Sequence, residues 1–231
     1  MDHVFHTAVT DFYENKSKGT LLIHNTYGEP DEMPLDVYFR KEHELSDLEL
    51  FALEHCQGKV LDVGAALGAL TLILQEYEFE VEALEISDVF CEIMKRQGVK
   101  SILNANFLST APEDSYDTLL MMMNGFGLCG SFAGLPEVFK AIDRYLSPGG
   151  QVILASSDIS YLYGKDLPEE KYYGEMDYAY EYAGEKGPWF KWLYIDSETL
   201  SQEAKKHGFD LQVLFTEETG QYLGRLTRQT T

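Results

Sequence analysis

The sequence predicts an α/β protein with a doubly wound, mostly parallel sheet. Residues 60–74 pass from a short apolar run, through a turn of small residues, into a second apolar run long enough for a helix. Strand-like and helix-like runs then alternate as far as about residue 155. Two strand-like runs around Thr219-Gly220 close the chain.

Composition and charge limit which kind of protein this is and which partners it can bind. With 231 residues, 45% of them hydrophobic, the chain suits one substantial domain with a decoration. The net charge of −21 disfavours nucleic acid and anionic membranes, because binding either would cost long-range repulsion. We therefore expect a small-molecule substrate, with a basic protein as the less favoured alternative. The oligomeric state stays unknown.

Metal, disulfide and membrane chemistry are not expected. The three cysteines are widely spaced without a C-x-x-C pair, and the His3/His6 pair has no further ligand nearby. The cysteine pattern suits a reducing cytoplasm, which is the expected location, and residues 1–6 lack the basic and apolar segments of a signal peptide. The charge-free stretch 118–135 contains four glycines, which favours a buried strand and a loop over a membrane span.

The first 57 residues are expected to form a cap segment before the sheet. Residues 1 to about 20 carry apolar side chains at helix spacing, and Leu21–Ile23 suggests a short strand. A helix from about Ser46 to Cys56 should begin with a capping box, because glutamate stands three residues after Ser46.

The stretch Val60–Leu74 holds the predicted ligand site. A helix that opens directly off a strand leaves unpaired N–H groups at the crevice, and small residues let a ligand approach the backbone. A nucleoside-bearing cofactor is expected there. The dinucleotide fingerprint would need glycine at three positions, which here hold Gly64, Ala66 and Ala69.

The strand over residues 80–86 ends in Glu85, whose two carboxylate oxygens suit the vicinal hydroxyls of a ribose. A helix over 88–97 should stop at Gly98. The further elements expected in the core are strands over 101–108, 115–123 and 151–155, a helix over 135–146, and a turn at 147–150.

Polar residues follow the fourth and fifth strands, at the edge where doubly wound sheets bind ligands. Asn124 follows the fourth strand and Asp158 the fifth. Two roles stay open for Asp158: it could act as a general base or orient the substrate, or it could only cap its loop. Asn124, Asp158 and Tyr161 are the candidate catalytic residues.

These motifs resemble class I S-adenosylmethionine-dependent methyltransferases. The first motif of that family is an acidic residue followed by glycines at alternate positions, here Asp62, Gly64, Ala66 and Gly68, with Ala66 replacing the usual glycine. A helix that ends in Leu-x-Pro-Gly-Gly before a strand is also widespread in the family. The resemblance covers residues 58–157 motif by motif and the flanking elements by order only.

The resemblance implies S-adenosyl-L-methionine as cofactor and a Rossmann-like, seven-stranded sheet whose last strand is antiparallel. Asn106 would receive the adenine amino group, where the family more often has Asp, and Phe107 would cover the ring. Arg40 could meet the cofactor carboxylate or form only a surface salt bridge. The implied cofactor-binding residues are Asp62, Gly64, Ala65, Ala66, Gly68, Glu85, Ile86, Asn106 and Phe107.

Residues 158–195 have no place in a minimal methyltransferase core and are expected to form an inserted β-hairpin. Seven tyrosines lie between 161 and 182, and seven acids with two lysines between 165 and 185. Such a hairpin could form an acidic, aromatic wall that attracts cations, or it could be a solvated hairpin. Residues 196–231 should add a helix capped by Ser197 and a closing strand pair over 209–216 and 221–227.

The expected reaction is in-line methyl transfer to a small molecule. Because a sulfonium methyl is already activated, the protein mainly holds the reacting atoms in line and excludes water. Two alternatives stay open. One is a non-catalytic module that binds S-adenosylmethionine or its demethylated product, and the other is a nicotinamide-dependent oxidoreductase.

Overall fold

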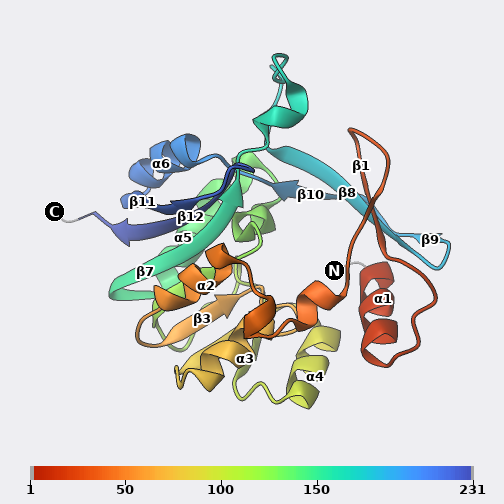
Figure 1. Ribbon diagram of the computed structural model, residues 1–231. Coiled ribbons are helices and arrows are strands. Elements are labelled where there is room, and N and C mark those ends of the chain that lie inside the picture. Colours follow the sequence, from red (N-terminus) through yellow and green to blue (C-terminus); the bar gives the residue numbers. More distant parts are fainter. Residues whose placement is uncertain (1–2, 230–231) are drawn as a thin grey trace.

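A seven-stranded mixed sheet forms the centre of the molecule (Figure 1). The structure is a computed structural model and describes residues 3–229, so the first two residues of the predicted N-terminal helix lie outside it. The strand order is β11-β12-β7-β6-β3-β4-β5, parallel except for β12, which runs antiparallel to β7 and β11. The predicted fold class is confirmed. The strands are β3 (Val60–Val63), β4 (Val81–Glu85), β5 (Ile102–Asn104), β6 (Tyr116–Met121), β7 (Leu146–Ser157), β11 (Phe209–Thr216) and β12 (Gln221–Arg228).

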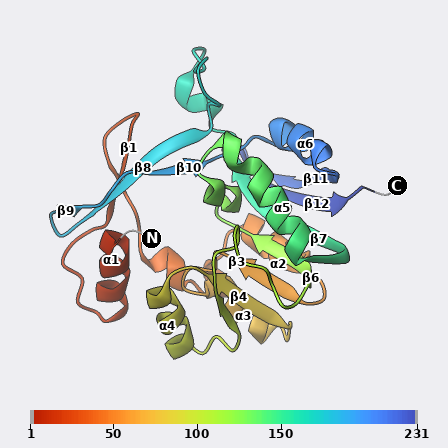
Figure 2. The same ribbon diagram turned by 180° about the vertical axis from the view of Figure 1, so that it is seen from behind.

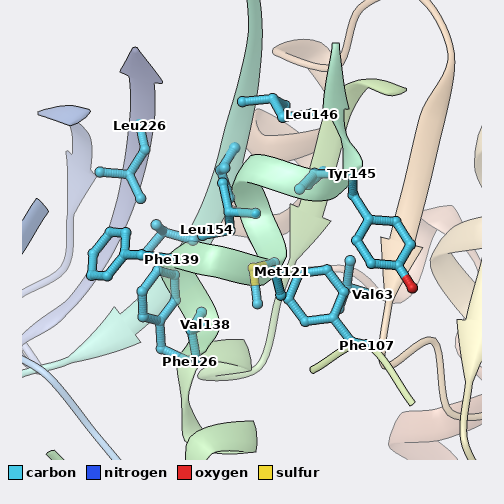
Figure 3. Packing of buried hydrophobic residues seen from close by; sticks show 14 of the residues in the cluster. Val63, Phe107, Met121, Phe126, Val138, Phe139, Tyr145, Leu146, Leu154 and Leu226 are labelled. Carbon is cyan, nitrogen blue, oxygen red and sulfur yellow. The ribbon is translucent and has the colours of Figure 1, made fainter. Parts of the chain in front are cut away.

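Helices cover both faces of this sheet. One face packs against α5 and α6 around Leu119 and Leu154, and the other against α2 and α3 around Leu120 and Ile153. Successive strand residues point to opposite faces, so these central strands are apolar throughout. α2 lies in front of the sheet in Figure 1, α5 lies in front in Figure 2, and Figure 3 shows the core beneath α5. The helices are α2 (Asp47–Glu54), α3 (Ala69–Glu76), α4 (Asp88–Gln97), α5 (Leu135–Tyr145) and α6 (Ser197–Lys206).

The helix ends agree with the sequence except at α6. Ser46 and Glu49 form the predicted capping box of α2, and α4 ends at Gly98 in the left-handed conformation. The predicted Ser197 cap is wrong. Asp196 caps α6 instead, because its side chain accepts the N–H of Thr199.

Two strand boundaries also differ from prediction. The third strand ends at Asn104, well before residue 108. The segment 147–150 continues β7, where Gly149 takes a φ of +78° that suits glycine. The Leu-x-Pro-Gly-Gly sequence therefore bends the start of the strand rather than forming a separate turn.

A second, small sheet joins two segments far apart in the chain. Its order is β10-β8-β1-β2, with β9 paired to β8, and Ile23 of β1 lies opposite Tyr180 of β8. The predicted hairpin is present as β8 and β10, but the addition of β1 and β2 was not predicted. Its strands are β1 (Leu22–Asn25), β2 (Asp31–Glu32), β8 (Glu175–Tyr182), β9 (Glu185–Lys186) and β10 (Phe190–Leu193).

The N-terminal helix α1 (His3–Tyr13) supports this small sheet. The ring of Phe5 stacks on Tyr180 with centroids 4.6 Å apart, and it also meets Phe90 of α4 edge-on. Figures 1 and 2 show the small sheet extending from the end of β7 toward α1. The cap segment and the insertion thus build one unit at the carboxyl end of the large sheet.

Short 3-10 turns connect these elements. They include η1 (Asp36–Phe39) and η2 (Glu42–Glu44). The charge-free stretch after β6 forms η3 (Gly125–Cys129) and η4 (Phe132–Gly134), and η5 (Ser160–Tyr163) follows β7. Within residues 3–229, no helix has the length and apolar character needed to span a bilayer.

Candidate functional site

The turn between β3 and α3 is held in an unusual backbone conformation. Gly64, Ala66 and Gly68 have φ values of 71°, 49° and 78°. Only glycine adopts such values without strain, so Ala66 carries the strain of the turn. Its N–H donates to a Glu85 carboxylate oxygen at 3.0 Å, which ties the turn to the end of β4.

One pocket opens on this turn. It lies between η1, the start of α3 and the residues that follow β6. Ala69 and Leu70 begin α3, where a helix leaves its first N–H groups without intrahelical partners. The lining residues are Val37, Tyr38, Arg40, Glu49, Asp62, Val63, Gly64, Ala65, Ala66, Leu67, Ala69, Leu70, Met122 and Met123.

Four of the predicted cofactor residues, from Asp62 to Ala66, therefore line one pocket. Gly68 does not line it but caps α3 beside it. A Cβ at Gly68 would lie 2.9 Å from Val99, so a side chain there would push against the neighbouring loop. The sequence did not single out Tyr38, Met122 or Met123, because nothing local to these residues marks them as lining a pocket.

Asp62 is a buried carboxyl group at the end of β3. It is 4% exposed, and its Oδ2 accepts a hydrogen bond of 2.6 Å from the Thr71 hydroxyl of α3. Burial raises the pKa of Asp62 to about 6, although the hydrogen bonds from Thr71 oppose this shift. The carboxyl group thus links the strand to the helix across the turn.

Glu85 ends β4 and is 2% exposed. One carboxylate oxygen accepts the N–H of Ala66 and the other accepts the N–H of Ser87 at 2.8 Å. Burial raises the pKa of Glu85, while these backbone hydrogen bonds lower it. The two oxygens have four lone pairs between them, and the Ile86 N–H is a third backbone donor to the group, so capacity to accept a hydroxyl remains. The next residue, Ile86, is 51% exposed.

Asn106 and Phe107 lie in the loop after β5. The side-chain oxygen of Asn106 accepts the N–H of Leu108 at 2.9 Å, and the residue is exposed. Phe107 is buried and packs on Tyr145 of α5 with ring centroids 5.0 Å apart (Figure 3). Contact of either residue with an adenine ring stays a prediction.

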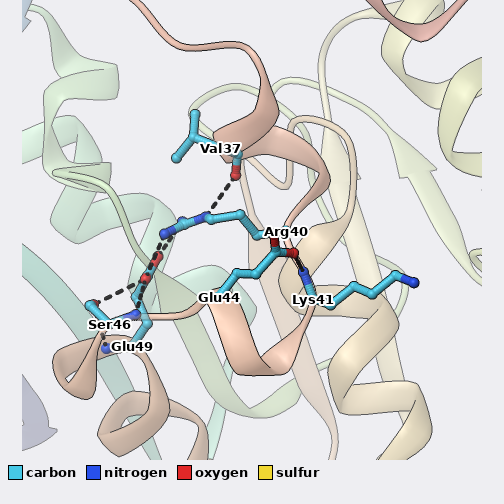
Figure 4. A network of polar contacts seen from close by, with 6 residues as sticks. All are labelled: Val37, Arg40, Lys41, Glu44, Ser46 and Glu49. Carbon is cyan, nitrogen blue, oxygen red and sulfur yellow. Dashed lines mark hydrogen bonds and ion pairs between the residues drawn. The ribbon is translucent and has the colours of Figure 1, made fainter.

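Arg40 is held in a two-point ion pair on the pocket wall (Figure 4). Its Nη1 and Nη2 donate to the two carboxylate oxygens of Glu49 at 2.9 and 2.5 Å, and its Nε donates to the Val37 carbonyl. Glu49 also accepts the Ser46 N–H as part of the capping box. Arg40 therefore forms a salt bridge, which was one of its two expected roles. The pair lines the pocket and is largely buried, so it does not lie on the surface.

Two successive residues after β6 have positive φ, 51° at Met123 and 58° at Asn124. Such strain in non-glycine residues is often found at functional sites. Met123 lines the pocket, and the side-chain oxygen of Asn124 accepts a hydrogen bond of 3.2 Å from the Ser157 hydroxyl at the end of β7. The two strand ends are thus joined beside the pocket.

Asp158 is engaged by its own loop and by the insertion. Its Oδ1 accepts the N–H of Ser160 at 2.8 Å and the hydroxyl of Tyr173 at 3.0 Å. The Tyr173 hydroxyl also lies 3.0 Å from the Oδ2 atom of Asp196. Asp158 therefore caps its loop, which leaves Oδ2 for a substrate-side role. Tyr161 lies on η5 and is 68% exposed.

Within residues 3–229, no group of three or more histidine, cysteine or acidic side chains is arranged to hold a metal ion. The three cysteines form no disulfide. Burial raises the pKa of Cys56 to about 12 and that of Cys129 to about 11, so neither supplies a thiolate at neutral pH.

Comparison with known proteins identifies the family. Residues 37–213 match the sequence profile described as "Methyltransferase domain". The chain belongs to this family. An S-adenosylmethionine-dependent methyltransferase from Bacteroides fragilis, solved in complex with S-adenosyl-L-homocysteine, is 35% identical in sequence. The two structures superpose with a TM-score of 0.90, over 98% of this chain and 95% of the other.

Two curated relatives match over shorter regions. Protein arginine N-methyltransferase 6 from Xenopus tropicalis is 29% identical over 57% of this chain. A 23S rRNA (uracil(747)-C(5))-methyltransferase from Pyrococcus horikoshii is 33% identical over 37% of it. The matched regions span only 40% and 22% of those relatives.

The methyltransferase is thus an α/β enzyme that uses S-adenosyl-L-methionine. Neither the nicotinamide-dependent alternative nor the non-catalytic module is supported. The pocket fits this cofactor: the turn has small side chains, the first residues of α3 line the pocket, and Glu85 faces the turn with hydrogen-bonding capacity left.

Proposed function

We propose that this enzyme methylates a small molecule held between the small sheet and the carboxyl ends of β6 and β7. The observation that carries the proposal is that the insertion contacts the end of β7 and also η3, the turn that follows β6. The Ile195 N–H donates to the Ser156 hydroxyl at 3.1 Å, and a Cβ on Gly127 would lie 2.2 Å from the Trp192 ring. A site bounded in this way suits a small acceptor.

The charge of the molecule supports the same acceptor class. The net charge of −21 opposes association with a polyanion such as RNA. The insertion adds to this field, because residues 158–195 hold eight acids and four lysines. An electrically neutral or cationic small molecule meets no such repulsion.

On the cofactor side of the site, the residues of the turn and of the end of β4 contact the cofactor. Glu85 accepts hydrogen bonds from the ribose hydroxyls, and Ile86 makes an apolar contact with the adenine. The residues of the first turn, Asp62 to Gly68, bring the backbone close to the ligand. When bound, the cofactor supplies a methyl group activated by its sulfonium sulfur. Asn106 and Phe107 stay candidate adenine contacts.

On the acceptor side, the chain positions the reactants and excludes water. Asn124 is oriented by Ser157, so its amide Nδ2 is free to donate a hydrogen bond to the acceptor. Asp158 is oriented by Tyr173 and presents its second oxygen to accept a proton or a hydrogen bond. Tyr161 forms the outer rim. The small sheet limits the access of solvent to Asn124 and Asp158, which are both partly buried.

The test is to follow a labelled methyl group from S-adenosylmethionine into an extract. The purified enzyme is incubated with dialysed cell extract and with the small-molecule fraction removed by that dialysis. We expect label in the small-molecule fraction. Label confined to protein or RNA would contradict the proposal and would favour the acceptor classes named for the two curated relatives. A Glu85→Ala variant serves as the cofactor-binding control.

A further inference from the structure

Met123 has three features that packing alone does not explain: a strained backbone, an exposed apolar side chain and a place on the wall of the pocket. Its φ is +51°, the residue is 43% exposed, and it lines the pocket together with Gly64. We propose that Met123 is a cofactor-binding residue whose side chain packs against the sulfonium group and its methyl. The inference rests on the proposed function through Glu85 as the ribose ligand, and it holds for any class of acceptor.

The backbone after β6 turns Met123 away from the core. Met121 is buried beneath α5 (Figure 3), and Met122 is buried on the opposite face of the sheet, in the cluster that includes α2. Because side chains alternate along a strand, a third residue in the same conformation would return to the face of α5. The positive φ values of Met123 and Asn124 end the extended chain instead and leave Met123 on the pocket wall.

This backbone conformation is costly and is held from the acceptor side. Glycine would adopt the positive φ without strain, whereas a methionine is held there against its preference. Two hydrogen bonds of Asn124 fix the turn: its carbonyl accepts the N–H of Gly127 at 2.8 Å, and its side chain accepts the Ser157 hydroxyl at 3.2 Å. Strain of this kind in a non-glycine residue is concentrated at ligand sites. The strain here aims one apolar side chain at the cofactor pocket.

The same loop approaches the cofactor turn at a second point. A Cβ on Gly64 would lie 3.9 Å from the side chain of Leu128 in η3. Met123 lines the pocket with Gly64 as well, so two apolar side chains of the loop after β6 bound the turn on that side. The wall of the pocket toward β6 is therefore apolar, which suits a methyl group better than a carboxylate or an amine.

The strand order places this wall at the sulfur end of the cofactor. β3 lies between β4, which ends in Glu85, and β6, which leads to Met123. Adjacent strands are about 4.8 Å apart, so the two strand ends are about 10 Å apart. Ala66 joins the two sides, because it lines the pocket and donates its N–H to Glu85. With the ribose on Glu85 and the adenine against Ile86 after β4, the sulfur reaches along the pocket toward Met123.

A methionine side chain suits a contact with a sulfonium group. It is flexible and apolar, and its thioether sulfur is polarizable, so it gains from an adjacent positive charge. Its carbon atoms also keep water away from the methyl group. S-adenosyl-L-homocysteine lacks both the charge and the methyl group. The contact therefore favours S-adenosylmethionine over this demethylated product.

Isothermal titration with both ligands tests the contact. Met123→Gly should weaken the binding of S-adenosylmethionine about tenfold and that of S-adenosyl-L-homocysteine much less. Met123→Leu should retain most of the affinity, since it keeps an apolar side chain of similar volume. Glu85→Ala should weaken both ligands by the same factor, because both carry the ribose. A ratio of the two affinities that is the same in Met123→Gly as in wild type would overturn the inference.

Urea denaturation separates a binding role from a structural one. Met123→Gly relieves the positive φ, so its midpoint should rise although S-adenosylmethionine binds less tightly. A lower midpoint would show that the side chain is kept for folding and would overturn the inference. Glu78→Gly is the matched control, because Glu78 has a φ of +64° and is exposed after the far end of α3. Its midpoint should rise while both affinities stay unchanged.

The same measurements separate this inference from the proposed function. If Glu85→Ala weakens both ligands while Met123→Gly leaves their ratio unchanged, the inference alone fails. Unchanged affinities in Glu85→Ala would remove the ribose ligand from the proposed function, and the ratio in Met123→Gly would still decide the role of Met123. Methyl label confined to protein or RNA would contradict the proposed acceptor and leave the inference standing.

Discussion

Asp62 provides a direct test of the electrostatics of the pocket. Its folded-state pKa is about 6 instead of 3.8, because the carboxyl group is fully buried. A raised pKa means that the folded protein binds the proton more strongly than the unfolded chain does. The stability that this group contributes is therefore fully present below about pH 4 and is lost as the pH rises through 6.

Ionisation of Asp62 in the folded protein lowers the free energy of unfolding by about 3 kcal/mol. This follows from the rise in pKa from 3.8 to about 6, because each tenfold change in proton affinity corresponds to about 1.4 kcal/mol. Asp62→Asn removes the charge and keeps an oxygen that accepts the Thr71 hydroxyl. The variant should therefore gain stability relative to wild type as the pH rises. Between pH 5 and 7.5 this gain should be about 1 kcal/mol.

Urea denaturation at several pH values measures this difference. The series starts at pH 5, because the protein has an isoelectric point near 4.5 and would be least soluble there. Asp166→Asn, in an exposed loop, is the matched control and should show no comparable trend. A difference between Asp62→Asn and wild type that does not change with pH would refute the reasoning.

Three other substitutions test the rest of the site. Glu85→Ala should weaken S-adenosylmethionine binding by about 2 to 4 kcal/mol in a titration, through two lost hydrogen bonds; unchanged affinity in a folded variant would remove it as the ribose ligand. Asp158→Asn should lower turnover and preserve cofactor affinity, since the amide still accepts from Tyr173; loss of both would point to a structural role. Arg40→Met should cost about 3 kcal/mol of stability by leaving Glu49 buried without its partner, and the double variant with Glu49→Met should recover most of it. Failure of that recovery in urea denaturation would contradict the pairing.

Local patterns predicted most elements of the large sheet. Apolar strands, the glycines of the β3–α3 turn and the capping box at Ser46 each depend on residues close in sequence. Such signals act within a few residues, so they are readable from one chain. The α6 cap was misassigned by one residue, because Asp196 and Ser197 are both good caps and only the backbone decides between them.

The small sheet could not be predicted in full, because its pairing joins segments far apart. Ile23 and Tyr180 lie opposite one another, yet nothing local to either strand specifies that partner. The same limit applies to the pocket wall. Tyr38 reaches the cofactor turn only because the segment around η1 folds back over it, and Arg40 meets Glu49 for the same reason.

The central claim is that the turn after β3 holds S-adenosylmethionine in this enzyme. Isothermal titration of the purified protein with S-adenosylmethionine, with NAD run in parallel, tests it most directly. We expect binding in the micromolar range for S-adenosylmethionine and no heat of binding for NAD. Binding of NAD alone, or of neither compound, would contradict the assignment of the site.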